Sequence, residues 1–267
     1  LKESDIKQLL EKFRYGYDKG KVLIPDYRRD IMHSVDVIED IGIAYGYDKI
    51  AALPLKTYTL GGTFPITRFV DKARELAVGM GFQEIYSPVL SNKNLLYPMM
   101  NVEDFGTVEI ENPMTELFSC VRTWILPQLM GLLSKNKNAE YPQKIFEQGL
   151  VTMLHERSEG KLGASATMKK DLKDYERMAV VVAHTKADFT EIKQALDFIM
   201  NNLGVKYEIE NTAHNSFIPG RVGRVVVNGK GVAYIGEMHP KVLSNFGMGV
   251  PVAAMEINLT DLFDVIK

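Results

Sequence analysis

The sequence predicts an α+β fold in which an antiparallel sheet is flanked by helices. Strand candidates and helical patterns are interleaved through the second part of the chain. Two strand candidates are joined by Asn228-Gly229, the strongest short hairpin signal in the sequence. In residues 107–149, a strand candidate, an apolar helix pattern and a second strand candidate follow one another. We expect this stretch to be the architectural centre of the fold.

Length and composition are those of an ordinary globular protein. The chain has 267 residues, of which 46% are hydrophobic and 25% are charged. This length suits one large domain, or a domain of about 200 residues with a smaller appendage. The formal net charge of −2 argues against a protein that coats nucleic acid or a membrane surface. A single cysteine, Cys120, favours a cytoplasmic location, and no apolar run suggests a membrane partner.

The first 50 residues resemble part of a small domain. A helical pattern covers residues 4–18, and a short strand candidate covers residues 21–24. A second helix runs from about residue 35 to residue 45, with Ser34 as its expected N-cap. This order predicts part of a small α/β or winged-helix-like unit at residues 1–50.

We expect residues 66–267 to form one larger domain, after a linker at residues 51–65 that contains a proline and a Gly-Gly pair. The chain opens on Leu1 inside a helical pattern, so we expect it to be a fragment of a longer polypeptide. Residues 157–176 are polar and rich in Gly, Ser and Lys, which predicts an exposed, mobile loop. The other predicted elements are helices at 67–81, 121–133, 188–203 and 240–246, and strands at 82–89, 144–149, 178–184, 207–210, 224–227, 231–237 and 252–257.

Four carboxylates near the end of the small domain are the sharpest chemical signal. Asp36, Glu39 and Asp40 have the spacing i, i+3 and i+4 and fall on one helical face, and Asp30 enters from the preceding loop. Like charges at this spacing repel, and a hard cation such as Mg²⁺ relieves the repulsion. Alternatively, acidic residues in a first helical turn favour the positive end of the helix dipole. The pattern alone favours this alternative.

Other residue types give weaker signals. The five histidines have no metal-ligand spacing, and His239 is interpreted as a structural residue between a hairpin and a helix. No P-loop, dinucleotide-binding glycine motif or nucleophile elbow is present. Cys120 has no basic residue fixed beside it and is expected to be a small packed residue. Arg221 and Arg224 suit phosphate or RNA backbone, although a solvated strand edge is the simpler interpretation.

Two sets of motifs occur in the chain. The first set is residues 25–30 (PDYRRD), continuing through 37–41 and 44–48. The second set is Asn112-Pro113-Met114, residues 122–127 (RTWILP), residues 145–149 (IFEQG) and residues 236–240 (GEMHP). The first set resembles the end of the B5 domain of the phenylalanyl-tRNA synthetase β subunit, and the second resembles its catalytic-like module. The residues of these motifs most resemble those of the archaeal and eukaryotic type of β subunit.

The resemblance implies a class II aminoacyl-tRNA synthetase fold. The helix at 67–81 with Ser87-Pro88 behind it looks like motif 1, which builds the subunit interface in this family. The family works as a heterotetramer of two α and two β subunits, in which the α subunit activates phenylalanine with ATP and passes it to tRNA(Phe). The implied partners are therefore the α subunit, a second β subunit and tRNA(Phe).

The resemblance also implies a metal site. The family binds Mg²⁺ with acids of the B5 end, and those positions match Asp30, Asp36, Glu39 and Asp40. This match favours the metal interpretation of the four carboxylates. Because the family shares the site with the α subunit, we expect the chain alone to bind the ion weakly or not at all.

The groups that bind ATP in an active class II site are missing. Such a site uses an arginine with an acid two residues later in motif 2, and a late arginine in motif 3. Depending on the alignment, the motif 2 positions hold Glu147 and Gly149 or Met153 and His155, and no arginine follows Glu256. We therefore expect a catalytically silent module without catalytic or cofactor-binding residues.

Two rival functions are kept open. In the first, the module retains its own adenylate chemistry, which predicts tight ATP binding. In the second, the chain is a nucleic-acid-binding module that uses the B5 portion with Arg221 and Arg224. That function predicts tight, salt-sensitive binding of tRNA or DNA.

Overall fold

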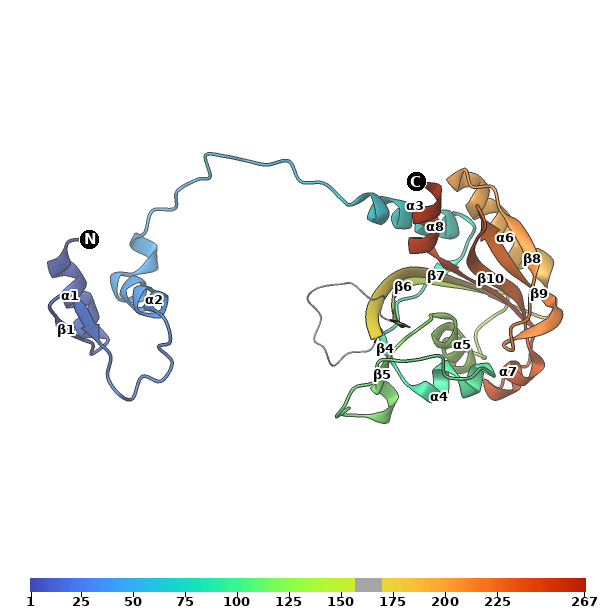
Figure 1. The fold of residues 1–267 in the computed structure, drawn as a ribbon, viewed down its shortest axis with the longest axis horizontal. Helices are drawn as coiled ribbons and strands as arrows, with labels where there is room; N and C mark the ends of the chain where they lie inside the picture. The colour runs from blue at the N-terminus through green and yellow to red at the C-terminus, as the bar shows by residue number, and fades with distance from the viewer. Residues whose placement is uncertain (157–169) are drawn as a thin grey trace. The chain divides into compact units, whose positions relative to one another are not determined.

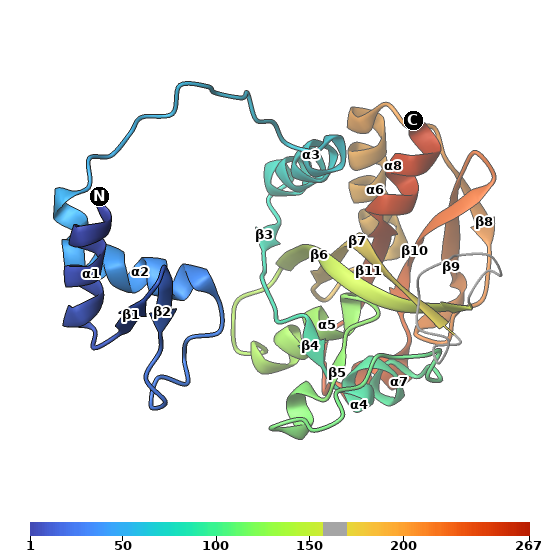
Figure 2. The same cartoon turned by 60° about the vertical axis from the view of Figure 1, so that its left-hand side comes forward.

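The chain is divided into two units, Leu1–Gly61 and Gly62–Lys267, each of which is described by itself. The structure is a computed structural model that describes residues 1–156 and 170–267 (Figures 1 and 2). Of the loop predicted at 157–176, residues 157–169 lie outside the described residues. Residues 170–176 are part of a strand instead, because their backbone pairs with residues 150–156, so this part of the prediction is wrong.

The first unit packs two helices with a two-stranded hairpin. Leu10, Tyr15 and Val37 form its small core. The hairpin turn uses Lys19 and Gly20, which both have positive φ. The elements are α1 (Glu3–Lys12), β1 (Gly16–Asp18), β2 (Lys21–Leu23), α2 (Ser34–Tyr45) and the short 3-10 helix η1 (Tyr47–Lys49).

Two predictions for this unit are wrong in detail. The first helix ends at Lys12 and not at residue 18, because Arg14 adopts a left-handed conformation with φ of 61° and the chain turns into β1. The N-cap of α2 is His33, and Ser34 is the first helical residue. The Nδ1 atom of His33 accepts the Val35 N–H at 3.3 Å, so a ring nitrogen replaces the expected hydroxyl oxygen.

A mixed seven-stranded sheet is the centre of the second unit (Figure 1). Its strand order is β3-β6-β7-β11-β10-β9-β8. All neighbouring strands are antiparallel except β3 and β6, which run parallel and make the sheet mixed instead of purely antiparallel. The strands are β3 (Gln83–Glu84), β6 (Gln143–Glu156), β7 (Lys170–Ala183), β8 (Glu208–Asn211), β9 (Phe217–Val227), β10 (Lys230–Met238) and β11 (Val252–Asn258).

The predicted hairpin at Asn228-Gly229 is confirmed. These two residues connect β9 and β10, and both have positive φ, 50° and 79°. Such angles match the twist of the flanking strands. The turn thereby pairs β9 with β10, two of the strands that line the polar pocket described below.

Helices cover both faces of the sheet (Figure 2). One core lies between the sheet and α3 (Pro65–Gly79), α6 (Phe189–Leu203) and α8 (Leu259–Ile266), and β7 contributes Met178, Val180 and Val182 to it. The second core lies on the opposite face, to which β7 contributes Ala179 and Val181. Because side chains alternate along a strand, a strand buried on both faces is apolar throughout. The helices of the second face are α4 (Lys93–Leu96), α5 (Leu126–Lys135) and α7 (Pro240–Asn245).

The central helix of the stretch 107–149 is α5, which is buried as expected. It begins at Leu126, not at residue 121, because Cys120–Val121 form strand β5 and pair with β4 (Leu90–Ser91). Pro127 lies in its first turn, where a missing N–H costs little. Leu129, Met130 and Leu133 are fully buried. The strand predicted at 82–89 is reduced to β3, and the chain leaves the sheet before Pro88.

Candidate functional site

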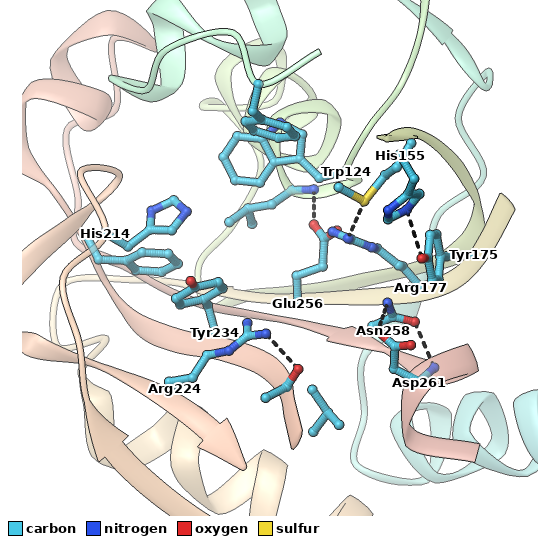
Figure 3. Close-up of a pocket in the computed structure, with 16 residues that line it drawn as sticks. Trp124, His155, Tyr175, Arg177, His214, Arg224, Tyr234, Glu256, Asn258 and Asp261 are labelled. Atoms are coloured by element: carbon cyan, nitrogen blue, oxygen red, sulfur yellow. Dashed lines mark hydrogen bonds and ion pairs between the residues drawn. The ribbon is translucent and has the colours of Figure 1, made fainter. Parts of the chain in front are cut away.

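A pocket of about 410 Å³ lies on the α5 side of the sheet (Figure 3). Strands β6, β7, β9, β10 and β11 all contribute side chains to it, and residues before α5 form another wall. A volume of this size accommodates a small organic ligand. Its aromatic lining consists of Phe105, Trp124, His155, Tyr175, His214, Phe217 and Tyr234.

Glu256 on β11 is the buried acid of the pocket, and the fold uses both of its oxygens. Its Oε2 accepts the backbone N–H groups of Ile125 at 3.0 Å and Leu126 at 2.9 Å, at the start of α5. A carboxylate is stabilised there by the unpaired N–H groups and by the helix dipole. Its Oε1 accepts a bond from Arg177 Nη1 at 3.1 Å. Glu256 therefore joins the sheet to α5 and has no excess charge to offer a ligand.

Arg177 on β7 lies between this acid and Tyr175 in Figure 3. Its Nη2 donates to the sulfur of Met153 at 3.1 Å, a weak acceptor. Its Nε is buried and has no hydrogen-bond partner among the described residues. Arg177 is thus paired through only one of its nitrogens with a strong acceptor.

Arg224 on β9 is the second guanidinium of the pocket. It stacks on the Tyr234 ring, 4.2 Å from the ring centroid, and its Nη2 donates to the carbonyl of Gly231 at 2.6 Å. A Cβ atom on Gly231 would lie 2.3 Å from Arg224 Nε, so only glycine leaves room for this arrangement. No carboxylate of the described residues lies within ion-pair distance of Arg224. Burial lowers the pKa of the Arg224 guanidinium, and the Arg177 cation acts in the same direction, whereas Tyr234 and Asp261 act against it.

Asp261, the other acid at the pocket, is also neutralised. Its Oδ1 pairs with Lys230 Nζ at 2.7 Å, and its Oδ2 accepts from Asn258 Nδ2 at 2.6 Å. Asn258 in turn caps α8, since its Oδ1 accepts the Asp261 N–H at 3.0 Å. Both acids of the pocket therefore serve the fold.

His214 lies at the centre of the aromatic lining. Its ring centroid is 4.8 Å from that of Tyr234, 5.2 Å from that of Phe217 and 5.9 Å from that of Trp124. Burial, assisted by the Arg224 charge, lowers the pKa of His214 to about 4, so the ring is neutral at pH 7. Its Nδ1 accepts the Ser216 N–H at 3.3 Å, which assigns the remaining proton to Nε2.

The two alternative motif 2 pairs occupy different places on β6. Met153 and His155 face the pocket, and His155 Nε2 bonds to the Tyr175 hydroxyl at 2.9 Å. Glu147 and Gly149 lie earlier on the strand and outside the pocket lining. The structure therefore brings only the second pair to the site.

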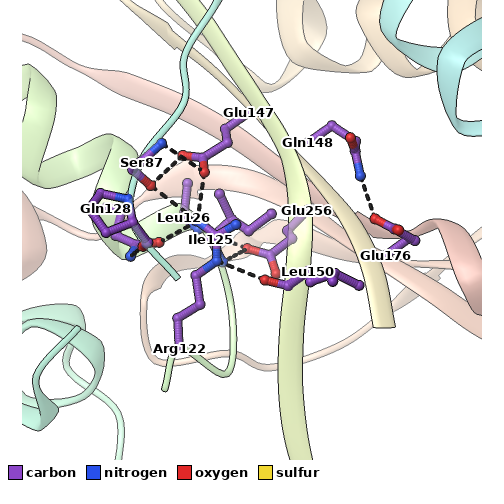
Figure 4. A network of polar contacts seen from close by, with 11 residues as sticks. Ser87, Arg122, Ile125, Leu126, Gln128, Glu147, Gln148, Leu150, Glu176 and Glu256 are labelled. Atoms are coloured by element: carbon purple, nitrogen blue, oxygen red, sulfur yellow. Dashed lines mark hydrogen bonds and ion pairs between the residues drawn. The ribbon is translucent and has the colours of Figure 1, made fainter. Parts of the chain in front are cut away.

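Glu147 belongs to a buried polar network (Figure 4). Its Oε1 accepts from Arg122 Nη1 at 2.6 Å, and the Ser87 hydroxyl donates to its Oε2 at 2.7 Å. The Arg122 guanidinium also donates to the Gln128 side chain at 3.0 Å and to the Leu150 carbonyl at 2.8 Å. The network ties β6 to the segment before β4 and to α5, so its role is structural.

The four predicted metal ligands are not gathered around one point. Asp30 and Asp40 both bond to Arg28, at 2.7 Å and 2.8 Å from its Nη2. Asp36 accepts the backbone N–H groups of Met32 and His33, which hold the pKa of its carboxyl below the usual range. Glu39 is exposed. In the described part of the chain, no group of three or more His, Cys, Asp or Glu side chains is arranged to hold a metal.

The remaining candidates have structural places. Arg221 pairs with Glu237 at 2.6 Å, whereas Arg224 faces the pocket, so the two do not form one phosphate-binding edge. Cys120 is buried, and burial raises the pKa of its thiol to about 11, as expected for a packed residue. His239 caps α7 by accepting the Lys241 N–H at 3.1 Å.

Sequence reasoning missed Arg177 and Glu256 as neighbours. Their strands are consecutive in the sheet but about 80 residues apart in sequence, and only the strand order β7-β11 brings them together. The one available signal was the two-residue spacing of Tyr175 and Arg177, which places both side chains on the same face of the strand.

Both parts of the chain match domains of tRNA synthetases. Residues 1–47 match the tRNA synthetase B5 domain, and residues 51–259 match the family described as phenylalanyl tRNA synthetase beta chain CLM domain. The chain belongs to the phenylalanyl-tRNA synthetase beta chain family. The resemblance inferred from the sequence motifs is thereby confirmed.

Similar curated proteins carry the same description. The chain is 45% identical over 267 residues to the phenylalanine–tRNA ligase beta subunit of Pyrococcus abyssi, covering 98% of this chain and 46% of that protein. It is 42% identical over 281 residues to that of Thermococcus onnurineus, covering 98% of this chain and 47% of that protein. For Archaeoglobus fulgidus the identity is 36% over 273 residues, with 99% and 46% covered. The chain thus spans about half the length of these relatives. Within the described residues, no helix has both the length and the apolar character needed to cross a membrane.

Proposed function

We propose that this chain is the B5 and class II synthetase-like portion of a phenylalanine–tRNA ligase β subunit, with boundaries at 1–50, 51–65 and 66–267. It works in the cytoplasm and supports an α subunit that attaches phenylalanine to tRNA(Phe) with ATP. The observation that carries the catalytically silent role is the buried ion pair between Arg122 and Glu147, of which Glu147 lies on β6. Neither motif 2 alignment places a free guanidinium on this strand.

The nearest alternative groups do not restore a nucleotide site. Met153 cannot pair with a phosphate, and Arg177 is held by Glu256 at 3.1 Å. The six antiparallel strands with helices on both faces support the class II-like part of the proposal. These contacts do not favour adenylate chemistry by this module itself. Nucleic-acid binding is not favoured either, since Arg221 is paired with Glu237 and Arg224 lines the pocket.

A groove of about 920 Å³ supports the role in assembly. Tyr86 and Leu117 line it and are 92% and 66% exposed. Apolar side chains this exposed, gathered in one groove, mark a protein interface. Ser87 and Gln128 line the same groove and bond to Glu147 and Arg122, so the buried network holds two side chains of the groove in place. We assign the α subunit to this groove, because the relatives are β subunits.

The proposal includes a Mg²⁺ site at Asp30, Asp36, Glu39 and Asp40, shared with the α subunit. The arrangement of the described residues does not fit the ion by itself, because Arg28 neutralises Asp30 and Asp40. We therefore derive no chemistry from the ion. This chain alone is expected to bind Mg²⁺ weakly or not at all.

Co-expression with the α subunit of one of the archaeal relatives tests the proposal. We expect the two chains to co-purify, and the complex to aminoacylate tRNA(Phe) more than the α subunit alone. No association, or equal aminoacylation with and without this chain, would contradict the assembly role.

A further inference from the structure

The pocket on the sheet holds polar groups that the fold does not fully use. We propose that it binds a small aromatic monocarboxylate, with Arg224 as the ionic anchor and the aromatic side chains as walls. This inference goes beyond the support of an α subunit and does not depend on it.

Charge balance in the pocket favours an anion. Glu256 is neutralised by Arg177 and two backbone N–H groups, and Asp261 by Lys230. Arg224 bonds only to a carbonyl and stacks on a ring, and no carboxylate of the described residues reaches it. Among the described residues, this half-buried cation therefore has no carboxylate in direct contact. A desolvated guanidinium binds a carboxylate through two parallel hydrogen bonds, which compensates its charge.

The walls of the pocket favour a flat ring. Trp124, His214 and Tyr234 lie around its interior in Figure 3, and their rings form a tilted series. Aromatic faces and edges bind another ring by offset or edge-to-face contacts. The volume of about 410 Å³ is sufficient for one substituted ring. His214 Nε2 carries a proton on a neutral ring and adds a donor without a second charge.

The same contacts exclude two related ligand classes. An aromatic amino acid brings an ammonium group, but both acids of the pocket are already engaged, so the ammonium finds no free carboxylate. A nucleoside triphosphate brings several negative charges, which one uncompensated guanidinium and two nearby carboxylates do not accommodate. The pocket therefore favours a single negative charge over a zwitterion or a polyanion.

Trp124 provides a direct readout, because it is the only tryptophan of the chain and lines the pocket. We would titrate the 267-residue chain with 3-phenylpropionate and indole-3-acetate, following Trp124 fluorescence and the heat of binding. The comparison ligands are 3-phenylpropanamide, L-phenylalanine, AMP and ATP. We expect saturable one-to-one binding of the two carboxylates, with at least roughly tenfold weaker binding of the amide, the zwitterion and ATP. AMP is also expected to bind at least roughly tenfold more weakly, and AMP binding as tight as that of the carboxylates would overturn the inference.

Matched arginine variants locate the anchor. Arg224→Met keeps the apolar stem and is expected to weaken carboxylate binding roughly tenfold or more. Arg224→Lys keeps the charge and provides a second test in case Arg224→Met does not fold. It is expected to bind the carboxylates with intermediate affinity. Arg221→Met, three residues away and outside the pocket lining, is expected to bind like the parent. Circular dichroism confirms that each variant is folded.

Three other results would overturn the inference. The first is no saturable binding of either carboxylate up to about 10 mM. The second is equal binding by Arg224→Met and the parent. The third is tighter binding of ATP or L-phenylalanine than of the carboxylates. Because these titrations use the chain alone, their failure leaves the proposed association with an α subunit intact.

Discussion

Arg122 and Glu147 form an ion pair inside the second unit, with an Nη1–Oε1 distance of 2.6 Å and side-chain exposures of 2% and 0%. Under one of the two alignments with the proposed class II fold, Glu147 takes the position of the phosphate-binding arginine. Here the charge at that position is turned inward and holds together β6, α5 and the segment at Ser87. Under that alignment, a position expected to face a nucleotide lies in the interior of this unit.

Removing one charge of this pair is expected to destabilise the fold strongly. Glu147→Gln leaves a buried guanidinium without its counter-charge, which typically costs about 3–5 kcal/mol. Urea unfolding followed by circular dichroism measures the change. Lys193→Gln breaks an exposed helical pair with Asp197 and serves as the control, with an expected cost of about 0.5 kcal/mol or less. Similar losses of unfolding free energy in both variants would show that the buried pair stabilises the fold no more than the exposed pair does.

Gly149 is predicted to be required for the same pair. A Cβ atom at this position would lie 2.3 Å from Arg122 Nη2, so Gly149→Ala must displace the guanidinium from Glu147. We expect a loss of about 2–3 kcal/mol in the free energy of unfolding, from leaving buried polar groups imperfectly paired. Gly79→Ala is the matched control, because no atom lies within 4 Å of its added Cβ and α3 gains helix propensity. A neutral Gly149→Ala would contradict the close packing at Arg122.

His214 is expected to make stability depend on pH. Its folded pKa of about 4 lies below the unfolded value of about 6.5, so the unfolded chain binds more protons between these values. The stabilising contribution is complete above pH 6.5 and decreases as the pH falls toward 4. Relative to His214→Phe, the parent is expected to lose about 1.5 kcal/mol between pH 6.5 and pH 5. Parallel urea unfolding at the two pH values measures this difference, and identical pH dependence of both proteins would contradict it.

The sequence contained most of the strand information. The Asn228-Gly229 turn and the apolar runs of β7 and β11 locate the centre of the sheet, since their patterns depend on local burial. The loop prediction is wrong at residues 170–176, because the solvated end of a long hairpin tolerates many charges. Local pattern therefore predicts buried strands better than exposed strand extensions.

The candidate site was less accessible to sequence reasoning. The sequence points to Arg224 as a candidate anion-binding residue, but its partner Tyr234 and its neighbour Arg177 come from two other strands. Spacing on α2 placed Asp36, Glu39 and Asp40 on one helix, whereas the pairing of Asp40 with Arg28 depends on how a loop folds back. Contacts between distant segments arise from strand order and loop path, and one sequence does not encode these in a local pattern.

The groove predicts a specific loss of assembly. Leu117→Asp places a charge on an apolar surface that we assign to the α subunit, and it is expected to weaken association at least roughly tenfold. Phe198→Asp on α6 removes another exposed apolar side chain, 43% exposed and outside the groove, and is the control. Equilibrium binding to an immobilised α subunit measures both. Equal loss in the two variants would remove the groove from the interface.

The four carboxylates predict a metal-dependent assembly. Asp36→Asn with Glu39→Gln keeps side-chain size, so it is expected to weaken α-subunit association in Mg²⁺ more than it lowers the unfolding free energy. Glu11→Gln with Asp18→Asn removes two other exposed acids and is expected to change neither. Equal α affinity of the first double variant and the parent, with Mg²⁺ present, would exclude the site.

The most direct test of the silent role is phenylalanine-dependent exchange of pyrophosphate into ATP by the isolated chain with Mg²⁺. The buried Glu147 and the non-basic Met153 predict no exchange above background by the chain, and clear exchange once the α subunit is added. Exchange by the chain alone, lost in Arg177→Met or Arg224→Met, would show that the sheet pocket performs its own adenylate chemistry and would contradict the account.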